Sequence, residues 1–305
     1  MLVENKDYHI PVLLKPSVDE LVQDVDGIYV DVTYGGGGHS AEILSRLSES
    51  GSLVAFDQDL DAEANLSKDS RLTFVRQNFS FYQNYLRALK KLPVDGVLAD
   101  LGVSSHQFDV AERGFSFRFD AGLDMRMNRD TDLTALDIVM NYDESELLRV
   151  FREYGELKNA YSVASRIVYR RKDEVIDTIE KLKSVLESLA PRGKFNTFYA
   201  KVFQALRIEV NDEMGVLREF LEKSVDVIRE GGRLVVITYH SLEDRMVKNF
   251  IKSGNVAGEL KKDFYGNVER PFKEVNRKPV IPGDDEVEMN NRARSAKMRV
   301  AERVG

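Results

Sequence analysis

Five short, β-rich runs separated by helix-length or longer segments constrain the fold of this chain more than any other feature. They occupy residues 28–32, 53–56, 72–75, 94–99 and 233–237. Strands that alternate with helical segments form βαβ units, in which neighbouring strands are parallel and helices cover the sheet. The sequence therefore predicts an α/β fold with a mainly parallel sheet.

Local signals set several boundaries. Ser17 and Glu20 have the spacing of a capping box, which predicts that a helix begins there. Gly231 and Gly232 precede the fifth run and predict the end of a helix. Residues 298–301 predict a last, antiparallel strand.

The segment between the fourth and fifth runs is much longer than a single βα crossover requires. It has helical periodicity, for example at residues 179–189, and a capping signal at residues 143–146. We therefore expect a discontinuous α/β domain, residues 1–106 and 213–305, interrupted by a helical domain at 107–212.

The first run leads into a glycine-rich turn at residues 35–38 and then a helix signal. Glycine lets the backbone approach a ligand closely, and a helix N-terminus favours an anionic group. The dinucleotide fingerprint G-x-G-x-x-G fails, because Ser40 occupies its third glycine position. The looser pattern D-x-x-x-G-x-G, which begins at Asp31, is found in enzymes that use S-adenosylmethionine (SAM).

Side chains at the ends of the following runs extend this site. Asp57 ends the second run, where a carboxylate can accept both ribose hydroxyls, and Asp100 ends the fourth. Phe79 follows the third run, where it can pack on an adenine face. Each feature alone has a structural explanation: a turn, a helix cap or a core aromatic residue. Together they favour a nucleotide-like cofactor without separating NAD from SAM.

Composition narrows the function classes. The chain has 305 residues, no cysteine and a formal net charge of −7. Without cysteine there is no disulfide or thiolate ligand, and the four histidines are widely separated, so we expect no metal site. The apolar runs are too short to cross a bilayer and the N-terminus lacks a signal pattern. We expect a cytoplasmic protein with no membrane partner.

The negative net charge conceals two basic segments. Residues 161–207 hold ten basic and five acidic side chains, and residues 290–303 hold five basic and one acidic. Arg166 and Arg170 share a helix face, which predicts a contact with RNA, the alternative being a solvated face.

Longer motifs resemble one known family. They are HIPVLL at 9–14, DLGVSSHQFD at 100–109, RGFSFR at 113–118, LDMRM at 123–127, FQALRIEVNDE at 203–213, HSLEDR at 240–245 and RARSAK at 292–297. In this order they cover nearly the whole chain and look like the MraW family. The resemblance implies a class I SAM-dependent methyltransferase domain (Rossmann-like) with an inserted all-α domain. It implies methyl transfer from SAM, leaving S-adenosylhomocysteine, to N4 of a cytidine (position 1402) in the decoding centre of 16S rRNA in the small ribosomal subunit.

The resemblance also assigns residues. Its SAM contacts carry over to Gly36, Gly37, Gly38, His39, Asp57, Phe79, Asp100 and Gln107. The chain departs from the family pattern on the substrate side, at His106, Gly122, Leu157, Lys201 and Asn291.

An exocyclic amine is a poor nucleophile, so positioning and a hydrogen-bond acceptor for the amine are needed. Asp100, Ser104 and Ser105 are the candidate acceptors, and the alternative for Asp100 is that it binds only the SAM ammonium. His240 follows the fifth run and is either a contact to base or phosphate or a structural histidine. The absent cysteine excludes the usual thiolate route to C5 methylation.

Three further residues, Arg113, Asp124 and Arg126, are expected either on the substrate side or in ordering their own loop. Two competing functions stay open: an NAD-dependent dehydrogenase, and a non-catalytic assembly protein that keeps a vestigial SAM pocket.

Overall fold

The computed structural model describes residues 11–305, which divide into two compact units. Unit 1 is discontinuous and combines the described part of Met1–Gly102 with Met214–Gly305. Unit 2 is the intervening segment, Val103–Glu213. His9, at the start of the first family-like motif, and the side chain of Ser105 lie outside the described part of the chain.

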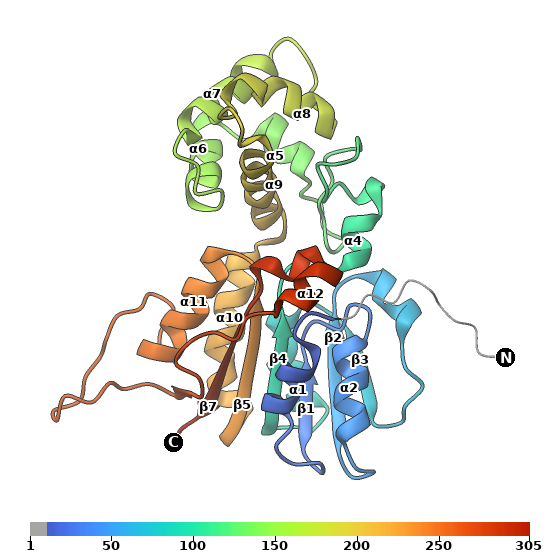
Figure 1. Ribbon diagram of the computed structural model, residues 1–305, viewed down its shortest axis with the longest axis vertical. Helices are drawn as coiled ribbons and strands as arrows, with labels where there is room; N and C mark the ends of the chain where they lie inside the picture. The colour runs from blue at the N-terminus through green and yellow to red at the C-terminus, as the bar shows by residue number, and fades with distance from the viewer. Residues whose placement is uncertain (1–10) are drawn as a thin grey trace. The chain divides into compact units, whose positions relative to one another are not determined.

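Unit 1 is built on a seven-stranded sheet with the order β3-β2-β1-β4-β5-β7-β6 (Figure 1). Its strands are β1 (Ile28–Asp31), β2 (Ser52–Asp57), β3 (Leu72–Arg76), β4 (Val94–Asp100), β5 (Ile228–Thr238), β6 (Phe272–Glu274) and β7 (Lys297–Arg303). Strands β1 to β5 pair in parallel, whereas β7 is antiparallel to both β5 and β6. The order 3-2-1-4-5 is that of a doubly wound, Rossmann-like sheet. The predicted α/β fold class and the antiparallel last strand are confirmed.

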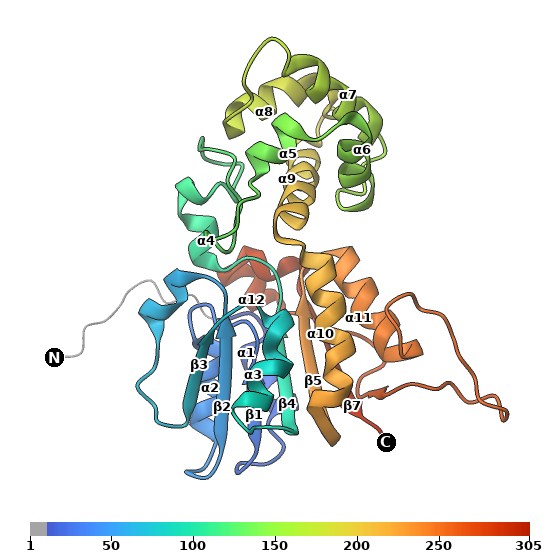
Figure 2. The ribbon, with the colours of Figure 1, turned by 180° about the vertical axis from the view of Figure 1, so that it is seen from behind.

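Helices cover both faces of this sheet (Figures 1 and 2). They are α1 (Leu14–Leu21), α2 (Gly38–Arg46), α3 (Tyr82–Ala88), α10 (Glu213–Val227) and α11 (Ser241–Ser253). The short helix α12 (Asp284–Met289) has no buried residue. Alternate strand residues enter two cores: Val30, Val97 and Val236 pack with α3, α10 and α11. Tyr29, Leu98 and Val235 pack with α1 and α2 on the opposite face. Because both faces are covered, the strands read as continuous apolar runs.

The topology fixes where a ligand can bind. Strand β1 lies between β2 and β4, and the chain proceeds from it to β2 and β3 on one side before returning to β4 and β5 on the other. In such sheets ligands bind beyond the carboxyl ends of the strands, where the order reverses. The ends of β1 and β4, at Asp31 and Asp100, flank that point.

Two helix boundaries predicted from sequence are wrong. Helix α1 begins at Leu14, and the Ser17 hydroxyl bonds back to the Leu14 carbonyl inside the helix instead of capping it. Helix α10 ends at Val227, and Gly231, with φ of +78°, lies within β5 beside a break in its register with β4. The same residue types serve other purposes here: a serine hydroxyl can bond to a carbonyl within a helix, and a glycine can accommodate an irregularity in a strand.

Unit 2 is helical, as predicted for the inserted domain. Its helices are α4 (Ser105–Asp109), α5 (Ala135–Asn141), α6 (Glu144–Glu153), α7 (Ala160–Arg170), α8 (Ile179–Leu186) and α9 (Phe195–Asn211). The capping signal of residues 143–146 is confirmed at the start of α6. The helices enclose a core that includes Ile138, Phe151, Ile167 and Leu206. Among the described residues no helix is both long and apolar enough to cross a membrane.

Candidate active site

The loop between β1 and α2 is held by buried polar contacts. Asp31 is fully buried and accepts hydrogen bonds from the Ser40 hydroxyl (2.7 Å) and the Thr33 amide (3.1 Å). Asp57, at the end of β2, accepts a bond of 2.7 Å from the amide of Gly35. The loop is therefore anchored at both ends, which fixes the amide groups between them.

The glycines of this loop have distinct roles. Gly35 and Gly37 have φ of +52° and +77°, a region in which other residues are strained. A Cβ at Gly38 would lie 2.2 Å from Cγ of Pro11, so close packing excludes a side chain there. A Cβ at Gly36 would meet no atom within 4 Å, so this part of the loop borders open space. Gly36 thus marks the place where a ligand can approach the backbone.

Asp100, at the end of β4, is positioned by residues from three other elements. Its Oδ1 accepts a bond of 2.7 Å from the hydroxyl of Tyr239, which follows β5. Its Oδ2 lies 3.7 Å from Nδ1 of His39 in α2, and its amide donates to Oγ1 of Thr33 at 2.7 Å. The side chain keeps 21% of its surface exposed, which leaves one edge for a ligand.

The carboxylates of Asp31, Asp57 and Asp100 favour a positively charged ligand at this site. Burial raises the pKa of Asp57 to about 6, against hydrogen bonds from the amides of Asp59 and Gly35. Burial likewise raises the pKa of Asp100 to about 6, although His39 and Tyr239 oppose the shift. Burial also raises the pKa of Asp31. Grouped carboxylates of this kind favour a positively charged ligand and disfavour the diphosphate of a dinucleotide.

A measurement of unfolding free energy at two pH values tests the raised pKa of Asp100. A raised pKa means that the protonated carboxyl stabilises the fold below pH 4 and that this stability is lost as the pH rises through about 6. The isosteric change Asp100→Asn removes the charge, so it is expected to raise the unfolding free energy by about 2 kcal/mol at pH 8. At pH 4 and below the two proteins should be equally stable. Urea unfolding of ligand-free protein at both pH values checks this, and equal stability at pH 8 would contradict a destabilising charge.

Phe79 lies near the end of β3, immediately after Asn78, whose side chain bonds to Gln58 beyond β2 at 2.9 Å. Its ring packs edge-on against Phe220, with centroids 5.6 Å apart. The ring is only partly buried, so it combines support from the core with an accessible surface. This placement is compatible with packing on a flat aromatic ligand.

His240 makes contacts that favour the structural alternative. It is the N-cap of α11: its Nδ1 accepts from the Glu243 amide at 3.4 Å, and its own amide donates to Glu243 Oε2. Its Nε2 lies 3.2 Å from Oε1 of the same glutamate. Both ring nitrogens therefore face Glu243, which explains the histidine by helix capping.

In unit 2, Ser104 and Gln107 form a reciprocal capping box at the start of α4. The Ser104 hydroxyl accepts from the Gln107 amide at 3.2 Å, and the Gln107 side chain accepts from the Ser104 amide at 3.0 Å. Gln107 exposes 5% of its surface. The S-x-x-Q spacing signals this arrangement in the sequence. These contacts give both side chains a structural role in unit 2.

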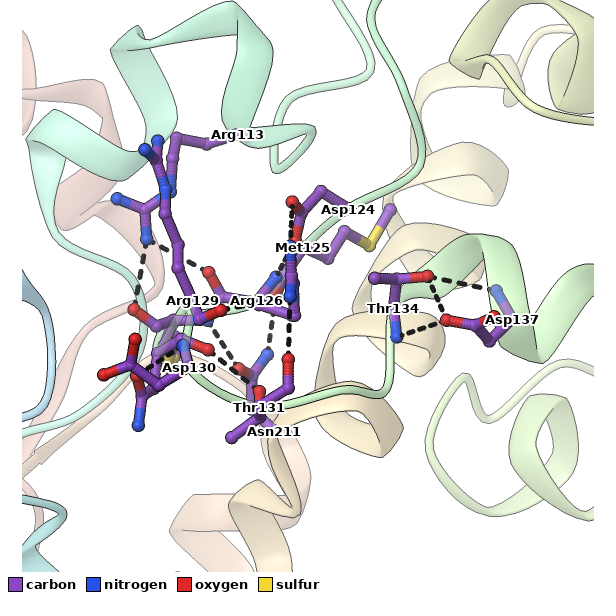
Figure 3. A network of polar contacts seen from close by, with 12 residues as sticks. Arg113, Asp124, Met125, Arg126, Arg129, Asp130, Thr131, Thr134, Asp137 and Asn211 are labelled. Atoms are coloured by element: carbon purple, nitrogen blue, oxygen red, sulfur yellow. Dashed lines mark hydrogen bonds and ion pairs between the residues drawn. The ribbon is translucent and has the colours of Figure 1, made fainter.

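Arg113 orders the loop that precedes α5 (Figure 3). Its side chain is 2% exposed, and Nη2 donates to the carbonyls of Arg126 and Met127 at 3.0 and 3.1 Å. The Asp124 carboxylate accepts two hydrogen bonds from the Arg126 guanidinium, of 2.8 and 3.0 Å. For this trio the contacts favour loop ordering over direct contact with a substrate.

Asn211, at the end of α9, ties the same loop to the helical core of unit 2 (Figure 3). Its Oδ1 accepts from the Met127 amide at 2.7 Å, and its Nδ2 donates to the Met125 carbonyl at 2.8 Å. Met125 has φ of +61°, so this network also holds a strained residue.

The predicted basic pair lies on α7. Arg166 bonds to the Ser188 hydroxyl at 2.9 Å, and Arg170, the last residue of the helix, pairs with Glu174 four residues further along the chain. Of the departures from the family pattern, Lys201 donates to the carbonyl of Glu156 at 3.3 Å. The Lys201 ammonium therefore forms a hydrogen bond to a backbone carbonyl of unit 2.

Sequence reasoning missed Tyr239 and Thr33, the residues that position Asp100. Tyr239 stands next to His240 at the end of β5, where the same strand-end rule that selected Asp57 and Asp100 would have found it. Thr33 lies inside the glycine-loop pattern, but no spacing rule singles it out.

Comparison with known proteins extends the sequence resemblance. The model of the MraW methylase family matches residues 6–304. Ribosomal RNA small subunit methyltransferase H of Flavobacterium johnsoniae is 56% identical over 298 residues, covering 98% of each chain. The protein of the same name from Bacteroides thetaiotaomicron is 56% identical over 296 residues, covering 97% of each. An rRNA methylase structure from Streptococcus thermophilus is similar at 14% identity and a TM-score of 0.43, covering 98% of this chain and all of that one. The chain belongs to the MraW methylase family.

Proposed function

We propose that this chain transfers a methyl group from SAM to the exocyclic N4 of a cytidine in the decoding centre of 16S rRNA, within the small ribosomal subunit. The observation that carries the proposal is the open glycine loop flanked by Asp57 and Asp100 at the switch point of the sheet. Relatives named as rRNA small subunit methyltransferases support the substrate class. Such a substrate implies a cytoplasmic enzyme.

The residues present fit SAM. Gly36, Gly37, Gly38 and His39 form the loop that would hold the methionine part, and Asp57 would accept the ribose hydroxyls. When bound, SAM supplies a methyl group on a positively charged sulfur. Its ammonium and sulfonium charges match the carboxylate cluster, whereas the diphosphate of NAD would be repelled by it. This contrast favours SAM over NAD.

Asp100 has two roles in this proposal. Tyr239 and Thr33 fix its orientation, so its exposed edge is pre-organised. That edge can accept from the SAM ammonium or from the N4 amine of the cytosine, since a carboxylate accepts several hydrogen bonds. In the second role it helps the amine to pyramidalise and to release a proton.

Helix α7 in unit 2 is the proposed RNA contact. Tyr161 and Tyr169 expose 60% and 63% of their surfaces on this helix. Arg166 and Arg170 lie within about 100° of Tyr169 around the helix axis. Exposed aromatic and guanidinium groups together are typical of surfaces that bind unpaired bases and phosphates.

Charge reversal tests this surface. The double variant Arg166→Glu/Arg170→Glu is expected to weaken binding of 16S rRNA at least tenfold and to reduce the slope of log K against log salt by about 1 to 2. SAM affinity should stay unchanged, because α7 belongs to a different unit from the glycine loop. Filter binding of 16S rRNA at several salt concentrations measures the RNA affinity and its salt slope. An unchanged affinity and slope would show that this is merely a solvated helix face.

The function itself is tested with SAM carrying a labelled methyl group. We expect label to enter the RNA of small ribosomal subunits prepared from cells that lack the enzyme, in preference to naked 16S rRNA. Incorporation into neither would overturn the enzymatic proposal and favour an assembly protein with a vestigial pocket. A titration in which NAD binds more tightly than SAM would instead favour the dehydrogenase.

A further inference from the structure

The segment between α11 and β6 forms a hairpin that projects from unit 1 (Figures 1 and 2). Lys262 and Val268 form an antiparallel bridge at its neck. At its tip the Asp263 carboxylate accepts hydrogen bonds of 2.8 Å from the amides of Tyr265 and Asn267, and of 3.0 Å from the Asn267 side chain. Gly266, with φ of +88°, completes the turn. The tip is thus an ordered structure.

This turn presents two aromatic rings to solvent. Phe264 and Tyr265 are 97% and 85% exposed. Their centroids lie 5.6 Å apart with ring planes at 87°, so the rings meet edge to face instead of stacking, and most of their surface stays exposed. Exposing large apolar groups on an ordered turn is unfavourable for an isolated protein, and such groups mark interaction sites.

The charges around the rings indicate the partner. Lys261 and Lys262 directly precede the tip and are exposed, and among the described residues neither has an acidic partner. The nearest acid, Asp263, is already bonded, and the Asn267 side chain is the main cause that lowers its pKa. An open groove of about 640 Å³ beside the hairpin is lined by the basic residues Arg270, Lys273 and Arg303 and also by the acidic residues Asp263 and Glu269. The cations that lie next to the rings are therefore the exposed side chains of Lys261 and Lys262.

We propose that this hairpin is a second RNA contact, in which Phe264 and Tyr265 stack on unpaired bases while Lys261 and Lys262 neutralise the adjoining phosphates. Exposed aromatic rings next to unpaired lysines are the combination that binds single-stranded RNA without sequence preference. The choice of RNA as partner rests on the proposed function. The hairpin then holds the substrate RNA through contacts separate from the glycine loop and from α7.

The test compares three double variants of the full chain. F264A/Y265A removes the rings, F264L/Y265L keeps the apolar surface without a π face, and K261Q/K262Q removes the charges. The probe is a fluorescein-labelled, unstructured RNA of about 20 nucleotides, longer than the 4–16 nucleotides that one such site spans. Anisotropy is measured over a range of salt concentrations. Ile281→Ala, at a residue 65% exposed in the same unit, is the control for loss of exposed apolar surface.

We expect F264A/Y265A and F264L/Y265L each to lose about tenfold or more in RNA affinity. K261Q/K262Q should lower the salt slope by about 1 to 2. Melting temperature and SAM affinity should match the wild type in all three. Wild-type affinity in the alanine variant, or in the leucine variant alone, would overturn the proposal; the latter result would show that apolar contact, and not stacking on a ring face, holds the RNA. Failure of the wild type to methylate small subunits would contradict the proposed function, whereas the anisotropy result decides the hairpin independently.

Discussion

Asp100→Asn is expected to lower methyl transfer at least about a hundredfold, because it replaces a charged acceptor at the ligand-facing end of β4 with a neutral one. The amide still accepts the bond from Tyr239, so the fold and the side-chain orientation should be preserved. SAM affinity by calorimetry and turnover at saturating SAM separate the two proposed roles. Loss of affinity alone assigns Asp100 to the SAM ammonium, whereas loss of turnover at saturation adds a role toward the amine.

Two controls sharpen this result. Asp226→Asn removes an exposed carboxylate on α10 and should change neither quantity. Tyr239→Phe removes only the hydrogen bond to Asp100, so a smaller loss of about tenfold is expected. An Asp100→Asn protein with wild-type SAM affinity and wild-type turnover would contradict both roles.

Gly36→Val is expected to weaken SAM binding by about a hundredfold, which corresponds to about 2.7 kcal/mol and lies near the upper end of the usual cost of steric overlap. The added side chain enters the open space beside the loop, where the protein itself has no atom within 4 Å of the new Cβ. The backbone at Gly36 is also outside the positive-φ region, so the fold should tolerate valine. Calorimetric titration with SAM measures the effect.

Gly283→Val is the matched control for this change. Its Cβ would also meet no atom within 4 Å, and its φ is −72°. Both variants should melt like the wild type, but only Gly36→Val should lose SAM affinity. If Gly36→Val bound SAM normally, the glycine loop would not be the cofactor cradle.

The fold was predictable because its signals are periodic and local. Buried parallel strands read as apolar runs, and Asp31, Asp57 and Asp100 mark the strand ends. The long gap before β5 indicated an insertion, placed from sequence at 107–212, and the structure delimits unit 2 as Val103–Glu213. Helix ends were less predictable, since the Ser17 hydroxyl can bond within a helix as readily as it can cap one.

Residues of the candidate site were predictable where their position in the sequence, such as the end of a strand, indicated them directly. Asp57 and Asp100 follow from the rule for strand ends, whereas Tyr239 acts on Asp100 across 139 positions of sequence. Such a contact arises only when β4 and β5 pair. The same limit applies to Arg113, whose burial against the Arg126 and Met127 carbonyls is a property of the folded loop.

The most direct test of the central claim is the chemical identity of the methylated nucleoside. Small ribosomal subunits are incubated with the protein and SAM, and their RNA is digested to nucleosides and separated by liquid chromatography with mass spectrometry. We expect N4-methylcytidine in 16S rRNA, and about a hundredfold slower formation of it by the Asp100→Asn protein, or by the Gly36→Val protein at subsaturating SAM. Methylation only at C5 or at the 2′-hydroxyl, or no methylated cytidine, would contradict the claim.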